Sequence, residues 1–100
     1  MNDNPLISIT VCVRNGKEWV DGCLESLTNQ TYRPLEIIAV DDGSTDGSRE
    51  SLEKWHNPEG EVPIFVFTQD ALGLSAGRNL AVRKSKGEWV AITDIDVRPT

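Results

Sequence analysis

Four short apolar segments, separated by stretches of helical periodicity, constrain the fold of this 100-residue chain more than any other feature. Each segment is rich in β-branched residues and too short for a buried helix, so each predicts a largely buried strand. Pro63, near the start of the third segment, favours an edge position or a strand that begins after the proline. The segments cover residues 6–13, 35–40, 62–68 and 89–93.

Three helical segments alternate with these strands, over residues 17–30, 48–55 and 73–84. In the first, apolar residues recur at spacings of three and four, which is typical of an amphipathic helix. The third has Ser75 as a plausible cap and cationic side chains in its last turn. This alternation, with right-handed crossovers, predicts an α/β fold: a Rossmann-like open parallel sheet with helices on both faces.

The charge balance and the lack of long apolar runs exclude several classes of protein. The formal net charge of -6 argues against nucleic acid as the main partner, because phosphate binding needs clustered cations. No apolar run approaches the ~20 residues that a membrane span requires. Residues 1–5 form a short tail without the pattern of a signal peptide. We therefore expect a cytoplasmic location, or one at the cytoplasmic face of a membrane held through segments outside this chain.

Several residues carry ordinary structural expectations. Cys12 and Cys23 lie in apolar-patterned segments and are interpreted as reduced core residues rather than as a disulfide. Core packing is expected for the large aromatic side chains. His56 lies in a surface loop and is expected to be exposed, with no partner that the sequence indicates. The aromatic side chains concerned are Trp19, Trp55 and Trp89.

Polar clusters follow three of the four predicted strands. They are Arg14-Asn15, Asp41-Asp42 and Asp94-Ile95-Asp96. In open α/β sheets, ligands bind beyond the carboxyl ends of the strands. The three clusters are therefore expected to converge on one edge of the sheet and to form a site there.

Asp94 and Asp96 are the candidate metal ligands. Carboxylates at positions i and i+2 of an extended segment project to the same side, and their hard oxygens suit Mg²⁺ or Mn²⁺. Such a cation would complete its shell with water and a diphosphate. A pair of solvated loop acids is the ordinary alternative, but the position directly after a buried strand favours the functional interpretation.

The other two polar segments allow both a structural and a functional interpretation. An acid at a strand end, such as Asp41 or Asp42, can accept hydrogen bonds from a base or a ribose, whereas residues 43–47 suit a turn and a helix cap. The small residues of 73–79 allow a phosphate to approach a helix N-terminus, and Arg78 could reach it; helix packing with a surface arginine explains this segment equally well. The sequence has neither P-loop spacing nor a G-x-G-x-x-G after its first strand.

Four sequence runs together resemble the N-terminal half of a family 2 glycosyltransferase with the GT-A fold. They occur in the order and spacing of that family and cover nearly all of residues 6–99. The runs are ISITVCVRNG, LESLTNQTYRPLEIIAVDDGSTDGS, GLSAGRNLAV and KGEWVAITDID.

The resemblance implies a nucleotide-diphospho-sugar donor, commonly a UDP-sugar, a divalent Mn²⁺ or Mg²⁺ ion, and inversion at the anomeric carbon. By matching position, Asp42 would contact the uracil, with Asp41 beside it, and Asp94 would lie near the ribose or the metal that Asp96 binds. The family often has P-x-Y-N after its first strand, and Arg14 could stack on the base in place of the missing aromatic. The other residues that the resemblance places at the donor site are Cys12, Asn15, Arg78 and Asn79.

In this family, the catalytic base and most of the acceptor pocket follow the Asp-x-Asp motif, and Thr100 lies four residues after Asp96. We therefore expect residues 6–100 to be the donor-binding half of a GT-A domain, incomplete at its C-terminus. Such a half would bind donor without turnover, and the acceptor, whether a sugar, a lipid or a protein, stays open.

Three alternatives remain at this point. A non-catalytic nucleotide-sugar binding module would share every motif. A nucleotidyltransferase would carry a glycine-rich basic loop after its first strand, for which residues 14–17 are short. A phospho-acceptor signalling domain would have a lone acceptor aspartate directly after the third strand, and the residues at this place are Thr68, Gln69 and Asp70.

Overall fold

The structure, a computed structural model, describes the backbone of residues 4–96 and their side chains, apart from those of residues 74 and 94–96. Strands and helices alternate along the chain as the hydrophobic pattern predicts. The strands are β1 (Ile7–Arg14), β2 (Leu35–Asp42), β3 (Ile64–Gln69) and β4 (Trp89–Asp96). The helices are α1 (Lys17–Thr28), α2 (Ser48–Glu53) and α3 (Leu74–Lys84).

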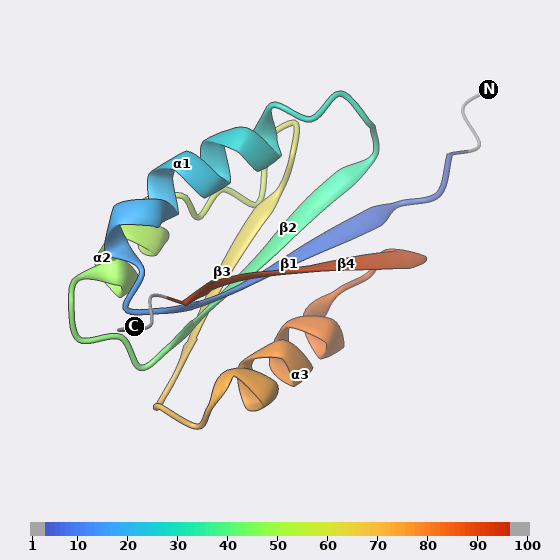
Figure 1. The fold of residues 1–100 in the computed structure, drawn as a ribbon. Helices are drawn as coiled ribbons and strands as arrows, with labels where there is room; N and C mark the ends of the chain where they lie inside the picture. Colours follow the sequence, from blue (N-terminus) through green and yellow to red (C-terminus); the bar gives the residue numbers. More distant parts are fainter. Residues whose placement is uncertain (1–3, 97–100) are drawn as a thin grey trace.

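The four strands form one parallel sheet in the order β3-β2-β1-β4. Helices α1 and α2 cover one face of this sheet and α3 covers the other (Figure 1). The predicted α/β fold, with helices on both faces of a parallel sheet, is therefore confirmed. No helix within residues 4–96 is long and apolar enough to cross a membrane.

The larger part of the core lies between the sheet and the helices α1 and α2. Val20 and Leu24 of α1 and Leu52 of α2 are fully buried there against β1 and β2. Every residue of β2 is buried, because neighbouring strands flank it and helices cover both of its faces. A smaller cluster around Ile38 and Ala81 packs beneath α3.

The strands extend further toward their carboxyl ends than the apolar pattern predicts. β1 continues to Arg14, β2 includes Asp41 and Asp42, and β4 runs to Asp96. The hydrogen bonds between neighbouring strands join backbone groups and do not depend on side-chain polarity, so the strand pairing continues past the apolar residues. Apart from Asn15, the residues of the polar clusters therefore lie within the sheet and alternate between its two faces, instead of following it in loops.

The outer edge of β3 is covered by the loop that precedes this strand. Asn57 and Ile64 exchange two backbone hydrogen bonds of 2.8 and 2.9 Å, and the backbone amide of Val66 donates to His56 Nδ1 at 3.1 Å. The exposed His56 thus has a partner, which the sequence did not indicate. The prediction for Pro63 is confirmed, because β3 begins at Ile64 and lies at an edge.

The outer edge of β4 is different. Within residues 4–96, β4 pairs with β1 alone. Its side chains at Trp89, Val90 and Ile92 are 65%, 38% and 56% exposed. The expectation of a buried Trp89 is therefore wrong, since this side chain at the start of the edge strand is largely exposed.

The other two tryptophans also differ from each other. Trp19 is largely exposed, since it lies on the outer side of the first turn of α1, so the prediction of core packing is wrong for this residue. Trp55 packs against the main core, as predicted, and its Nε1 donates to Asp21 Oδ1 at 2.8 Å. Neither Cys12 nor Cys23 forms a disulfide within the described residues, and burial raises the pKa of Cys23.

A buried polar network ties the loop before β4 to the amino ends of β1 and β2. Glu36 Oε2 accepts hydrogen bonds from Ser8 Oγ at 2.6 Å and from the Lys86 amide at 2.8 Å. Ser8 Oγ in turn accepts from the Gly87 amide at 2.8 Å. A Cβ at Gly87 would lie 2.6–2.7 Å from Ser8 and Leu6, so the loop can approach only because residue 87 is glycine.

We predict that Gly87→Ala lowers the free energy of unfolding by about 1–3 kcal/mol, because the added methyl group pushes the loop away from this network. Gly22→Ala is the matched control: nothing lies within 4 Å of a Cβ in the middle of α1 at that position. Since alanine favours a helix over glycine by up to about 1 kcal/mol, the control variant should be more stable than the wild type. Urea unfolding measures both effects, and a Gly87→Ala variant at least as stable as the wild type would contradict the prediction.

Candidate functional site

The carboxyl ends of β1, β2 and β4 place the predicted site residues in cross-strand rows. Cys12 pairs with Asp94, and Arg14 pairs with Asp96. On the other side of β1, Arg14 lies against Asp42, to which its guanidinium forms an ion pair at 3.7 Å. Asp42, Arg14 and position 96 therefore follow one another across three adjacent strands.

Asp42 is the most constrained member of this row. Its side chain is fully buried, and its Oδ1 accepts hydrogen bonds from Gln69 Nε2 at 2.8 Å and from the Leu72 amide at 2.9 Å. Its Oδ2 accepts from the Gly73 amide at 3.1 Å and faces the Arg14 guanidinium. Asp42 thus holds the loop that leads into α3 and also contacts the neighbouring row position in β1.

Arg14 is the accessible member of the row, since its side chain is 44% exposed. A guanidinium fixed on one side by a carboxylate keeps its planar face free for stacking on an aromatic ring. Because Arg14 is in register with Asp96, it also places a positive charge next to the end of β4, where the two acids Asp94 and Asp96 lie.

Asp41 occupies the opposite face of the sheet from Asp42, because successive residues of a strand alternate in direction. Its Oδ2 accepts the Ser44 amide at 3.1 Å, and its buried Oδ1 has no hydrogen-bond partner among the described residues. The structure therefore separates two acids that the sequence places side by side.

Asn15 joins Asp41 on the α1 side of the edge. Its φ of 53° is left-handed, and its Oδ1 accepts the Thr45 amide at 2.8 Å while its own amide donates to Ser44 Oγ at 2.9 Å. The neighbouring Gly16 amide donates to Ser48 Oγ at 3.0 Å. These bonds clasp the β1–α1 loop to the β2–α2 loop and make this part of the edge rigid.

The start of α3 lies over Cys12. A Cβ at Gly77 would overlap the sulfur of Cys12, so the helix packs directly on this buried residue, and the structural interpretation of the small-residue segment is confirmed at this point. Gly73, with a φ of 103°, is the N-cap residue of α3 and makes no side-chain cap hydrogen bond, so the prediction that Ser75 is the cap is wrong. Arg78 and Asn79 lie exposed on α3.

The donor set for a metal is incomplete within the described side chains. No group of three His, Cys, Asp or Glu residues comes together among them. The side chains of Asp94 and Asp96 fall outside that description, and the backbone places the two residues two positions apart in β4, on the row positions of Cys12 and Arg14. Two carboxylates in that arrangement fit a hard divalent cation.

Sequence reasoning missed Gln69 and the loop amides that bind Asp42. Gln69 is 27 residues from Asp42 in the chain, and only the pairing of β3 with β2 brings them together. A polar residue at the end of the third predicted strand was the one available signal.

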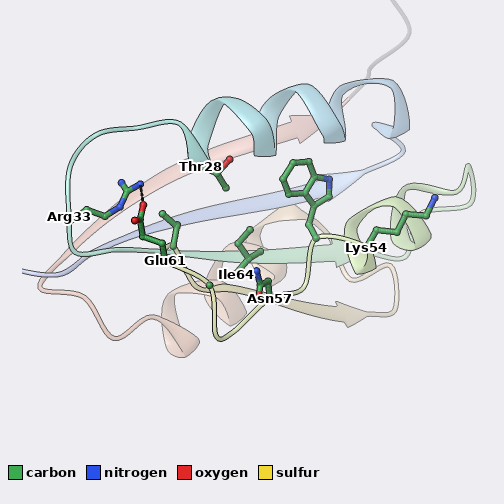
Figure 2. Close-up of a pocket in the computed structure, with 9 residues that line it drawn as sticks. Thr28, Arg33, Lys54, Asn57, Glu61 and Ile64 are labelled. Carbon is green, nitrogen blue, oxygen red and sulfur yellow. Dashed lines mark hydrogen bonds and ion pairs between the residues drawn. The ribbon is translucent and has the colours of Figure 1, made fainter.

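A cavity of about 360 Å³ lies elsewhere, between the end of α1 and the loop before β3 (Figure 2). Trp55 and Ile64 line it together with Arg33 and Glu61, which form an ion pair at 3.0 Å. Because Ile64 begins β3 and Arg33 precedes β2, this cavity is at the amino end of the sheet. It contains none of the predicted site residues.

Comparisons with known proteins show the fold and the family of this chain. The fold matches GT-A glycosyltransferases of known structure: the mannosyltransferase PcManGT from Pyrobaculum calidifontis, in complex with GDP-Man and Mn²⁺, aligns with a TM-score of 0.81 and 27% identity over 92% of this chain and 28% of that one. S. aureus TarS 1–349 aligns with a TM-score of 0.74 and 28% identity over 88% of this chain and 26% of that one.

The sequence profile of Glycosyl transferase family 2 matches residues 8–100, and the chain belongs to this family. It is 39% identical over 90 residues to the cholesterol galactosyltransferase of Borreliella burgdorferi, and this alignment covers 90% of this chain and 25% of that protein. It is 38% identical over 92 residues to the poly(ribitol-phosphate) beta-glucosyltransferase of Bacillus spizizenii, over 90% of this chain and 14% of that protein. The chain thus spans about a quarter or less of the length of these two relatives.

The hydrogen bonds that join the β1–α1 loop to the β2–α2 loop, here called the clasp, include those of Asp46 and lead to a prediction about pH. Burial acts to raise the pKa of Asp46, but hydrogen bonds from the Ser48 hydroxyl and from the amides of Lys17 and Ser48 together lower it below its ordinary value. A lowered pKa in the folded state means that the ionised carboxylate stabilises the fold. This contribution is complete above the ordinary carboxyl pKa and is lost as the pH falls through the lowered one.

We therefore expect Asp46→Asn to lower the free energy of unfolding at pH 7, and the difference from wild type to shrink below about pH 4. Urea unfolding across this range measures it. Glu59→Gln, which neutralises an exposed acid outside the clasp, serves as the control for net charge. A difference between Asp46→Asn and wild type that stays constant with pH would contradict the expectation.

Proposed function

We propose that this chain binds a nucleotide-diphospho-sugar, with UDP-sugar as the first candidate, at the carboxyl edge of its sheet on the α3 side. The observation that carries the proposal is the row formed by Asp42, Arg14 and position 96 across β2, β1 and β4. In the full-length protein, the sugar would pass with inversion to an acceptor hydroxyl on a sugar, a lipid or a protein. The bound GDP-Man and Mn²⁺ of the PcManGT complex support this class of ligand.

The base of the nucleotide would lie against Asp42 and Arg14. A carboxylate has about four lone-pair positions, and three hydrogen bonds and the Arg14 guanidinium occupy those of the fully buried Asp42. A base would therefore reach Oδ2 only when the exposed Arg14 side chain moves aside. The exposed Arg14 guanidinium would stack on the ring. Cys12, buried beneath Gly77, would support this part of the donor site from inside the fold. Asp41 and Asn15 lie on the other face of the sheet and would hold the loops at the carboxyl edge in place.

The diphosphate would lie between α3 and β4. Arg78 and Asn79 lie on α3 and would contact phosphate or ribose oxygens, while Asp94 and Asp96 would hold Mn²⁺ or Mg²⁺. Such an ion, when bound, offsets the negative charge that develops on the leaving diphosphate. Two cysteines without a disulfide, Cys12 and Cys23, suit a reducing compartment, in keeping with donor binding in the cytoplasm.

Sugar transfer also needs a base that deprotonates the acceptor hydroxyl. In the two relatives above, at least three quarters of the protein lies outside the matched segment. We propose that residues outside this segment supply the base and the acceptor pocket, and that the 100-residue chain by itself binds donor without turnover.

Calorimetry with UDP, GDP and CDP, each with and without Mn²⁺, tests the proposal. We expect one nucleoside diphosphate to bind in a metal-dependent manner, and Asp96→Asn to weaken this binding by at least about tenfold, because one charged metal ligand is lost. Arg14→Ala should weaken nucleotide binding while leaving its metal dependence in place.

Glu59→Gln is the control for the loss of one negative charge and should bind as the wild type does. Thermal unfolding of each variant establishes that the chain is folded before it is titrated. Equal binding with and without Mn²⁺, or unchanged binding by Asp96→Asn, would refute the metal assignment. A folded wild-type chain that binds none of the three nucleotides would refute the proposal as a whole.

A further inference from the structure

We propose that Gln69 is a positioning residue for nucleobase recognition, acting through Asp42; this inference rests on the proposed function. Gln69 ends β3 in register with Asp42 of β2. Its Nε2 donates to Asp42 Oδ1 over 2.8 Å. Gln69 thus extends the functional row to the fourth strand, so that the row crosses the whole sheet.

The two oxygens of Asp42 have different tasks. Oδ1 accepts from Gln69, which ends β3, and from the Leu72 amide of the β3–α3 loop. Oδ2 faces the Gly73 amide and the exposed guanidinium of Arg14. Because the donors on Oδ1 fix the plane of the carboxylate, they also fix the direction in which Oδ2 faces the Arg14 guanidinium.

The loop of residues 70–73 strengthens this arrangement. A Cβ at Gly43 would lie 2.6 Å from the Ala71 amide nitrogen, so the turn after β2 packs directly on this loop. Gly73 has a φ of 103° and precedes the first turn of α3. Gln69 also lies close to α3, since its Nε2 is 3.6 Å from the position of a Cβ at Gly77.

Loss of the Gln69 amide would leave Oδ1 with a single backbone donor. The carboxylate could then turn toward Arg14, and a guanidinium engaged by both oxygens would no longer be available to stack on a base. The effect should fall on the nucleoside part of the ligand and not on its diphosphate, because Gln69 and Asp42 lie on the β2–β3 side of the row, away from β4.

The test compares two probes, each with Mn²⁺: the nucleoside diphosphate that the wild-type chain binds most tightly among UDP, GDP and CDP, and inorganic pyrophosphate. Gln69→Met keeps the length of the side chain and removes the donor. We expect it to weaken nucleoside diphosphate binding about fivefold, the equivalent of one hydrogen bond, and to leave pyrophosphate binding unchanged. Gln69→Glu should weaken it further, because a second carboxylate would face Asp42.

Gln30→Met is the matched control, since Gln30 is exposed in the α1–β2 loop and lies far from the row. Gln69→Asn provides a second variant that keeps a polar strand end but is too short to reach Asp42, and it should behave as Gln69→Met does. The amide resonances of Leu72 and Gly73 report on the loop in the same samples.

The outcomes separate the two proposals. If the wild-type chain binds no nucleoside diphosphate, the proposed function fails. If it binds one, and the Gln69 variants either bind it equally well or lose nucleotide and pyrophosphate to the same extent, the positioning role of Gln69 is refuted while donor binding stands.

Discussion

The parallel pairing of β1 with β2 on one side and β4 on the other is the constraint on which the rest of the structure depends. It brings three strand ends to a common edge and sets Arg14 between Asp42 and position 96. A slip of β1 by one residue against both neighbouring strands would move Arg14 to the α1 face and separate it from Asp42 and from position 96. The buried residues of β2 oppose such a shift, because each face of that strand has its own apolar cluster.

Much of the fold could be predicted because hydrophobic periodicity is a local signal. The ends of the strands could not, since the backbone ladder continues into polar residues when a partner strand is present. The separation of Asp41 from Asp42 follows from that continuation, because alternation applies only once both residues belong to β2. The burial of single apolar residues could not be predicted either. Trp19 and Trp89 are apolar and yet largely exposed, because burial depends on which other elements pack against a residue.

The candidate site divides in the same way. Arg14 and Asp42 could be named from their places at strand ends, and the structure brings them into contact. Gln69 could not, because its role depends on a pairing between strands that are far apart in the sequence. The bonds from the loop amides of Leu72 and Gly73 could not be predicted either, since every residue except proline has a backbone N–H donor.

The two borders of the sheet are unequal. At β3, Asn57 and His56 already occupy the outward-facing backbone groups of Ile64 and Val66. At β4, no described residue does so, and apolar side chains stand exposed on both faces. Within residues 4–96, the sheet is therefore open at β4, and a strand that paired with this edge would lie next to the strand that carries Asp94 and Asp96.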